Sequence, residues 1–433
     1  MQDKYLPMGV DELADILSLT IKQDKENKVA TFLCQLSAFT EDSQFNVILN
    51  APSSSGKTYI PLEISYLFPK EDLIVIGNIS ASAFFHEQGV LNKETNTITI
   101  DYARKILVLL DMPHTGVLEK IRPLLSHDEK EMVSKITDRD QKGGHRTKTV
   151  ILKGYPAVIF CSAGFKMDEQ ELTRFLVLSP ESTQEKLSEG INQAIYKEVN
   201  PEEYRRFIQS DERRALLKER ILDIKNAHIC DIRISNEQLI RDRFFTNKNG
   251  LKSRHQRDIK RFMSLIKTIA LLNYWWRNPV NNEITANESD VEEAFKIWEK
   301  ISISQEMNLS PYVYSIYQTI FIPLWKEKRI ANKKLNLLAS NDCGISRLEV
   351  AQKYYDVFQV FLDSHKLRLD ILHSLETAGL ITQEFDPNDR RNKLLYPTID
   401  IEEYNVNEGG VVDHAQLQVH ALKITGDTTE ARP

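Results

Sequence analysis

The chain has no apolar run long enough to span a membrane. Its longest, Ile106 to Leu110, is broken by Asp111, whereas a membrane helix needs roughly 20 apolar residues. The N-terminal segment MQDKYLPMGVDEL also lacks the cationic stretch followed by an apolar one that marks a secretory signal. We therefore expect a cytoplasmic protein without membrane contact.

Cysteine is scarce and scattered. The four cysteines, Cys34, Cys161, Cys230 and Cys343, form no CxxC pair, which excludes the common zinc motifs and a disulfide framework. Neither a primase-type zinc motif nor a polymerase-type carboxylate cluster is present. If the protein serves replication, priming would need a partner protein.

An excess of positive charge is also missing. The net charge of -6 excludes a uniformly basic nucleic-acid coat protein, so any DNA contact must use local basic patches. The length of 433 residues predicts two or three domains.

The first part of the chain reads as a nucleotide-binding α/β core, residues 1–180. Helical periodicity from Val10 to Phe39, interrupted at Lys22 to Lys28, predicts two helices. Short apolar runs alternating with helical segments predict a parallel sheet with helices on both faces. The predicted strands are Phe45–Leu49, Leu73–Gly77, Lys105–Leu110, Ala157–Cys161 and Phe175–Leu178.

Three further regions follow this core. Residues 181–308 are charged and helical, with an amphipathic segment from Ile259 to Trp276, and we interpret them as a helical lid or linker. Residues 309–402 predict three helices and a hairpin, as in a winged-helix domain. Residues 403–433 are polar and predict a flexible tail.

A phosphate-binding loop follows the first predicted strand and opens a helix, the context that makes this motif informative. Its backbone N–H groups would cradle the phosphates of ATP, with Lys57 neutralising the β and γ phosphates and the Thr58 hydroxyl holding Mg²⁺. Alanine replaces the usual first glycine, which is harmless where φ is negative. The alternative is a chance serine-rich turn. The predicted loop comprises Ala51, Pro52, Ser53, Ser54, Ser55, Gly56, Lys57 and Thr58.

An acid-ended strand supplies the metal side of the predicted site. Lys105–Asp111 is apolar up to its final carboxylate, which places Asp111 beside Mg²⁺ at the carboxyl edge of a parallel sheet. The catalytic glutamate usual at the next position is replaced by Met112. Asp111 itself, His114 or Glu119 would then orient the attacking water, or hydrolysis is slow.

Two more polar residues adjoin the remaining strands. Ser162 ends the strand Ala157–Cys161 and is a candidate γ-phosphate sensor, or else an ordinary strand-end serine. Arg174 precedes the last strand, where in a ring it would reach the neighbouring subunit's ATP as an arginine finger. Its alternative is a surface ion pair with Glu169 or Glu171.

The motif order, ending in Leu172-Thr-Arg-Phe-Leu-Val-Leu, resembles AAA+ helicases, namely the minichromosome maintenance group and replicative helicases of phages and mobile elements. The resemblance implies that Arg174 and Phe175 are the finger pair. Ser253 to Ile266 resembles the family's lid helix, which makes Arg257 the second sensor, with Arg254 as a substitute.

A basic hairpin at residues 132–153 is the predicted DNA contact. Alternating segments surround a Gly-Gly turn, and in helicases of this kind such a hairpin projects into the ring's pore. It would bind phosphates without sequence preference. A solvated turn is the alternative, and the wing of the C-terminal domain is equally suited to DNA or protein. The predicted DNA-binding residues are Lys142, His145, Arg146 and Lys148 in the hairpin and Arg390, Arg391 and Lys393 in the wing.

The sequence thus favours an ATP-driven helicase or translocase of a replication module, working as a ring, such as a hexamer, on single-stranded or forked DNA. An AAA+ initiator or loader that uses ATP as a switch fits the same motif order. A degenerate P-loop scaffold that does not hydrolyse ATP is the non-enzymatic alternative.

Overall fold

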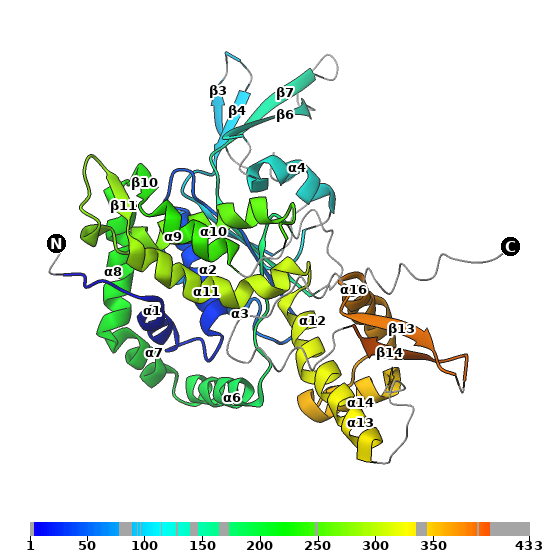
Figure 1. Ribbon diagram of the computed structural model, residues 1–433. Coiled ribbons are helices and arrows are strands. Elements are labelled where there is room, and N and C mark those ends of the chain that lie inside the picture. The colour runs from blue at the N-terminus through cyan, green and yellow to red at the C-terminus, as the bar shows by residue number, and fades with distance from the viewer. Residues whose placement is uncertain are drawn as a thin grey trace.

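The computed structural model describes residues 4–77, 89–92, 94–95, 97–113, 115–126, 129–138, 146–163, 173–246, 250–334, 344–387 and 389–398. Within these residues a central sheet carries helices, a second sheet projects from one end, and a smaller helical unit follows at the C-terminal side (Figure 1). The predicted nucleotide-site residues lie in the first of these parts, and the predicted DNA-binding residues belong to the second and third.

The central sheet has five parallel strands in the order β2-β5-β8-β1-β9. The predicted parallel sheet is therefore confirmed. The chain crosses from β1 to the far edge, returns through β5 and β8, and ends beyond β1, so the connections change direction at β1. In such sheets ligands bind outside the carboxyl ends of the strands at this switch. The strands are β1 Val47–Asn50, β2 Leu73–Ile76, β5 Ile106–Leu109, β8 Ala157–Ser162 and β9 Leu176–Leu178.

Both faces of the central strands are buried, which is why they read as continuous apolar runs. Val47 and Leu49 pack into one hydrophobic cluster together with the N-terminal helices. Ile48 points to the opposite face and packs into a second cluster. The period of two along each strand thus divides one run of sequence between two cores.

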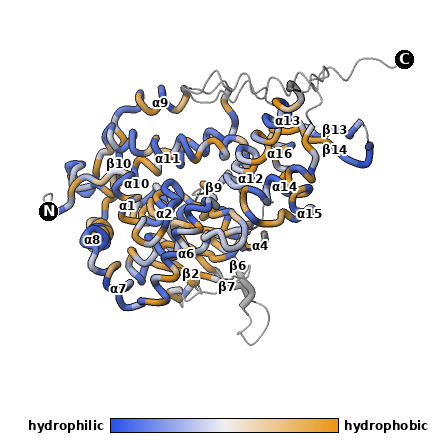
Figure 2. The backbone as a smooth tube through the Cα atoms, turned by 90° about the horizontal axis from the view of Figure 1, so that it is seen from below, coloured by the Kyte–Doolittle hydropathy of each residue, from blue (hydrophilic) through white to orange (hydrophobic). Residues whose placement is uncertain are grey.

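Helices cover the first face. Helices α1 and α2 from the N-terminus and α10 and α11 from the helical region share one hydrophobic cluster with this side of the sheet, and apolar residues recur along their tubes (Figure 2). The region interpreted as a lid or linker is therefore packed into the core. It is not wholly helical either, because β10 and β11 pair in parallel within it. The elements are α1 Val10–Leu17, α2 Lys25–Ser37, α3 Tyr59–Ser65, α6 Gln184–Val199, α7 Pro201–Ser210, α8 Glu212–Ala227, β10 Asp231–Ile234, α9 Glu237–Phe245, α10 His255–Leu272, β11 Glu283–Ala286 and α11 Glu288–Glu306.

The opposite face carries α4 and the base of the second sheet, within the described residues. That sheet, in the order β3-β4-β7-β6, contains the predicted hairpin as β6 and β7 and projects from the body (Figure 1). Gly154, which follows β7, has φ +78°, and a Cβ there would lie 2.5 Å from the Ala103 backbone nitrogen. Only glycine allows this close return into β8. The elements are β3 Val90–Asn92, β4 Thr97–Asp101, α4 Thr115–Ser126, β6 Glu131–Asp138 and β7 Arg146–Lys153.

A side chain closes the β9 edge of the central sheet. The Gln305 side chain, at the end of α11, accepts from the Val177 N–H at 3.3 Å and donates to the Val177 carbonyl at 2.6 Å. The amide group thereby bonds the edge strand as a neighbouring strand would, so that these buried backbone groups are satisfied.

The C-terminal unit has its own hydrophobic cluster, with three helical segments and a three-stranded sheet in the order β12-β14-β13. The predicted three helices and hairpin are present, and the sequence analysis missed β12. Among the described residues no helix is long and apolar enough to cross a membrane. The elements are α12 Pro311–Ile316, η4 Tyr317–Phe321, α13 Ile322–Lys334, β12 Ile345–Ser346, α14 Arg347–Phe358, α15 Ser364–Lys366, η5 Leu367–Ile371, α16 Leu372–Thr377, β13 Ile381–Phe385 and β14 Lys393–Pro397.

Candidate nucleotide site

The predicted phosphate-binding loop connects β1 to α3. Gly56 has φ +89° and Ser54 has φ 65°, so the loop turns back through left-handed conformations that expose its backbone N–H groups. Ala51 has no positive φ, which explains why alanine replaces glycine there. The Lys57 ammonium donates to the Pro52 carbonyl at 3.3 Å, which places its charge over the loop.

The strand ends bring the other predicted residues to the same edge. The Ala51 N–H donates to the Ser162 carbonyl at 3.1 Å, and Asn50 pairs with Ser162 in register. Ser162 is buried. Asp111, which follows β5, is exposed, and its carboxylate accepts from the Met112 N–H at 2.9 Å. The carboxyl edge thus carries the loop, Asp111 and Ser162 together.

Cys161 is a buried thiol at the same edge of the sheet. Its thiol donates to the Lys57 carbonyl at 3.3 Å. Burial raises the pKa of the Cys161 thiol to about 12, while the charge of Lys57 lowers it and that of Asp111 raises it. One buried atom therefore feels both the lysine and the carboxylate. The sequence analysis gave Cys161 no role in the site.

These residues fit Mg²⁺ bound with ATP. Mg²⁺ keeps several waters and takes one or two protein ligands in addition to phosphate oxygens. The described residues contain no group of three or more His, Cys, Asp or Glu side chains suited to a metal, and this mode of binding needs none. Thr58 and Asp111 would hold the ion, which would neutralise charge on the phosphates.

A cavity of about 460 Å³ adjoins the loop. Its walls come from the segment between α1 and α2, from α3 and from α6. They suit a planar apolar group with a polar edge, as a nucleotide base would be. The lining includes Thr20, Ile21, Ser55, Tyr59, Leu187 and Ile191.

Lys186 on α6 lines this cavity and also bonds to the phosphate-binding loop. Its ammonium donates to the Ser55 carbonyl at 3.3 Å and to the Glu181 carbonyl at 2.9 Å, and it forms an ion pair with the buried Asp24. The sequence analysis missed Lys186, because its distance from the loop along the chain hides the contact.

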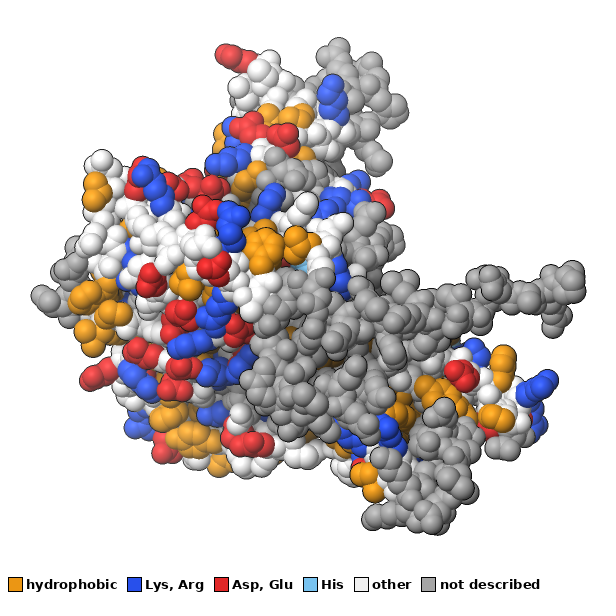
Figure 3. All heavy atoms as spheres, viewed as in Figure 1, with side chains coloured by type: hydrophobic (Ala, Val, Ile, Leu, Met, Phe, Trp, Pro, Cys, Tyr) orange, Lys and Arg blue, Asp and Glu red, His pale blue; other side chains and the backbone are white. Residues whose placement is uncertain are grey.

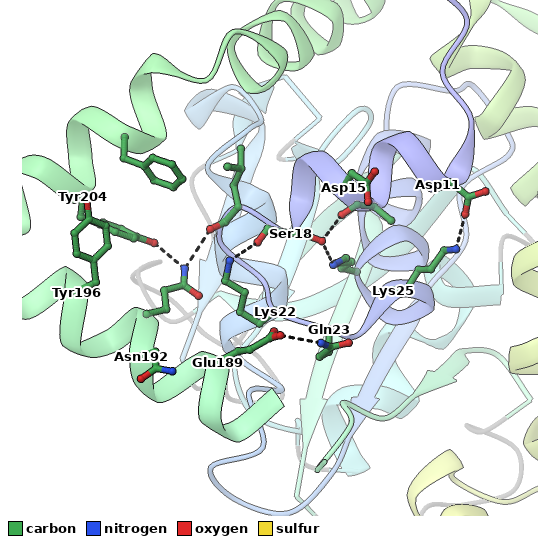
Figure 4. Close-up of a pocket in the computed structure, with 15 residues that line it drawn as sticks. Asp11, Asp15, Ser18, Lys22, Gln23, Lys25, Glu189, Asn192, Tyr196 and Tyr204 are labelled. Carbon is green, nitrogen blue, oxygen red and sulfur yellow. Dashed lines mark hydrogen bonds and ion pairs between the residues drawn. The ribbon is translucent and has the colours of Figure 1, made fainter. Parts of the chain in front are cut away.

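A second cavity, of about 770 Å³, shares Lys22, Gln193 and Tyr204 with the first. Figure 4 shows α1 and the following segment facing α6 and α7 across it. Gln193 crosses the gap, donating to the Thr20 carbonyl at 3.0 Å and to the Tyr204 hydroxyl at 2.9 Å. These bonds hold α6 against the N-terminal segment that also lines the base cavity.

Lys28 lines the second cavity and is 2% exposed. Burial lowers its pKa from 10.5 to about 8, so at pH 7 the folded chain carries a buried charge. The Lys28 ammonium donates to the Ser18 hydroxyl at 2.6 Å and to the Ile21 carbonyl at 3.1 Å, and Lys28→Met loses both bonds. Because the cost of the buried charge is larger than that of the two lost bonds, we expect Lys28→Met to stabilise the fold at pH 7, by at most about 2 kcal/mol. The gain should shrink from pH 8 to 10.5, because the native lysine loses its proton first. Urea unfolding at pH 7 and pH 10 measures it.

The control for this prediction is Lys22→Met, which changes a half-buried lysine of the same cavity. We expect it to alter stability by less than about 0.5 kcal/mol. A Lys28→Met protein less stable than the native chain at pH 7 would contradict the prediction.

The two predicted arginines lie at the other edge of the sheet. Arg174 precedes β9, and Arg257 donates to the Thr173 hydroxyl. All five strands are parallel, so this is the amino edge. With β1 four residues long, the two edges are roughly 13 Å apart at about 3.3 Å per residue. Arg257 therefore lies away from the phosphate loop of its own chain, and its role as a second sensor stays a prediction.

Arg254, the substitute sensor, is also placed elsewhere. It is buried and donates to Asp258 at 3.1 Å, to Gln305 at 2.8 Å and to Asn308 at 2.7 Å. These bonds fasten α10 to the end of α11. In this structure the Arg254 guanidinium is thus bonded within the core, and its role as substitute sensor stays a prediction.

The predicted DNA contacts are described only in part. Lys142 and His145 lie outside the described residues, as does the side chain of Arg146. Lys148, opposite Ile136, falls on the same face of β7 as the buried Val150. In the wing, Arg391 pairs with Asp389 at 2.9 Å, Lys393 lies 5.5 Å from the Phe385 ring centre and Arg390 is exposed. Among the alternative water-orienting residues, Glu119 is exposed on α4, and His114 lies outside the described residues.

Comparison with known proteins adds two likenesses to solved structures. No family model and no curated protein matches the chain. A predicted ATPase from Cytophaga hutchinsonii is 14% identical, covering 68% of this chain and 85% of that chain, with a TM-score of 0.34. The C-terminal region of NrS-1, in an apo form, is 11% identical, covering 90% of this chain and 76% of that chain, with a TM-score of 0.27. At such TM-scores neither likeness assigns a function, and the assignment must come from the site.

Proposed function

We propose that the chain is an AAA+ ATPase that moves along DNA as a ring of several copies. The observation that carries the proposal is the convergence of the phosphate loop, Asp111 and Ser162 at the carboxyl edge of one parallel sheet. Lysine and backbone N–H groups there bind phosphates, and Asp111 and Thr58 bind Mg²⁺. The adjoining cavity receives the base.

The placement of the arginines supports assembly into a ring. A phosphoryl-transfer site gains most of its transition-state stabilisation from positive charge near the γ-phosphate. Arg174 and Arg257 lie at the edge away from their own loop and so serve a neighbouring copy. Each copy would then offer a phosphate loop on one side and arginines on the other.

Action on DNA rests on the projecting sheet. Its outward face carries Lys135, exposed on β6 opposite Thr149, and in the sequence the predicted basic residues Lys142, His145 and Arg146 fall between β6 and β7 or at the start of β7. On the face of the body shown in Figure 3, acidic and basic side chains are intermixed. Phosphate binding by the hairpin would therefore be local, weak at high salt and independent of sequence.

The alternative is an initiator or loader in which ATP sets a state. It is favoured by the exposed Asp111 with Met112, not glutamate, beside it. In the winged-helix interpretation of the C-terminal unit, that unit would then hold origin DNA.

One experiment separates these functions: ATP turnover with and without single-stranded or forked DNA, together with sizing in ATP. We expect DNA to accelerate turnover several-fold, ATP to shift the protein to a ring-sized species, and the stimulation to fade as salt rises from 50 to 200 mM. ATP binding and DNA retention with no turnover would establish the switch instead. If the protein did not bind ATP, the remaining interpretation would be a degenerate P-loop scaffold without enzymatic activity.

A further inference from the structure

Arg261 on α10 bonds to the backbone on both sides of Arg174, the predicted arginine finger. Its guanidinium donates to the Thr173 carbonyl at 2.6 Å and to the Phe175 carbonyl at 2.7 Å, the two backbone groups on either side of Arg174. Asp258, one turn earlier on the same helix, pairs with it at 3.2 Å. The side chain is 8% exposed, and a planar guanidinium can bond two carbonyls in a fixed geometry that lysine cannot reproduce.

Other contacts hold the same short segment. The Arg174 side chain donates from Nε to the Ser126 hydroxyl at 2.9 Å, at the end of α4. The Leu176 N–H donates to the Asn46 carbonyl at 2.8 Å, just before β1. Three elements thus hold Arg174: α10 bonds the backbone on either side of it, α4 bonds its side chain, and the central sheet fixes the strand that follows it.

The surroundings of Arg174 suit a phosphate. Arg174 and Arg257 line a cavity of about 470 Å³, and Asp42 is the one acidic residue among the described residues that line it. Lys260, Arg261 and Lys267 also line it, so the described part of its lining has more basic than acidic side chains. Burial lowers the pKa of Arg261 to about 10, which still leaves it protonated at pH 7.

We propose that Arg261 is a positioning residue that holds Arg174 in place for the ATP of the neighbouring copy. The proposal rests on the proposed function, because it requires a finger that acts between copies. Since Arg261 belongs to α10, any displacement of this helix displaces the finger as well. The helix that packs on one subunit's core would then set the catalytic rate of the next subunit's site.

The test compares Arg261→Lys with Arg277→Lys. Arg277 is a matched control, because it is also a buried arginine, paired with Asp290 at 2.7 Å, but it does not contact the finger segment. We expect Arg261→Lys to lower kcat for ATP 10- to 100-fold, since a misplacement of about 1 Å can cost 100-fold. Affinity for a fluorescent ATP analogue should stay within twofold, and Arg277→Lys should keep its kcat.

Mixing decides whether the defect acts between copies. In a ring with Lys57→Ala subunits, each Arg261→Lys subunit keeps an intact phosphate loop, and its neighbour supplies an intact finger. Turnover should therefore recover. Unchanged kcat in Arg261→Lys, an equal loss in Arg277→Lys, or no recovery on mixing would each overturn the proposal.

Ser126→Ala keeps the idea testable if Arg261→Lys fails to fold. It removes the acceptor of the Arg174 side chain at a half-buried position, and it should also lower kcat with ATP affinity retained. A fully active Ser126→Ala protein would then overturn the proposal. Arg174→Ala, measured alongside, separates the two levels. If Arg174→Ala kept full turnover, Arg174 would not be an arginine finger. If Arg174→Ala lost turnover but Arg261→Lys kept it, only the positioning role of Arg261 would be refuted.

Discussion

Lys57→Ala is expected to reduce ATP turnover by a factor on the order of 100 to 1,000, the usual cost of losing one preorganised group that stabilises transition-state charge. The Lys57 ammonium lies over the phosphate loop, on the Pro52 carbonyl, and no other lysine belongs to the loop itself. ATP affinity should also fall, because in the proposed site the lysine would contact the phosphates in the ground state. Steady-state hydrolysis and titration with a fluorescent ATP analogue measure the two effects.

The control for Lys57→Ala is Lys186→Ala. Lys186 also reaches the loop, through the Ser55 carbonyl, but is held by an ion pair with Asp24. We expect Lys186→Ala to weaken binding more than turnover, because it supports the loop and base cavity. If Lys57→Ala bound and hydrolysed ATP like the native protein, the loop would not be a phosphate site and the proposed function would fail.

Arg174→Ala is expected to lower kcat about 1,000-fold or more, as arginine fingers contribute 10³ to 10⁵. ATP affinity of the subunit's own site should stay nearly unchanged, because Arg174 lies at the opposite edge of the sheet. This split between affinity and turnover distinguishes a residue that serves a neighbour from one that serves its own site. Single-turnover hydrolysis on ATP-loaded protein reports it directly.

Sizing in ATP is the companion measurement for Arg174→Ala. The variant should form the same assembly as the native chain, so that the loss of turnover is not a loss of the ring. Arg174→Lys is the conservative variant, and it should recover little, because lysine cannot present a planar fork. A variant with low ATP affinity but native kcat would assign Arg174 to its own site instead.

The central sheet was predictable because four of its five strands, β1, β5, β8 and β9, are buried on both faces. Its apolar runs, such as Ile106–Leu109 and Ala157–Ser162, therefore stand out in a charged sequence. β10, Asp231–Ile234, was missed because half its residues are charged and only Ile232 is buried. Strands that pair at the surface leave little trace in hydropathy.

The candidate nucleotide site could be predicted only where its residues are contiguous in the sequence. The loop and Asp111 are predicted by the local spacing of their residues, and Arg174 is predicted by its position just before a strand. Arg261 and Lys186 act through bonds to backbone carbonyls far away in the chain, and carbonyls carry no sequence signature. The edge on which Arg257 lies likewise depends on how α10 packs, which periodicity alone does not specify.

The side chain of Gln305 has a consequence for how copies associate. An open β9 edge would invite another chain to extend the sheet by strand addition, the usual beginning of uncontrolled aggregation. With the Val177 N–H and carbonyl both bonded to Gln305, that route is blocked at this edge. In the proposed ring, any contact between copies at this edge would therefore use side chains and not an added strand.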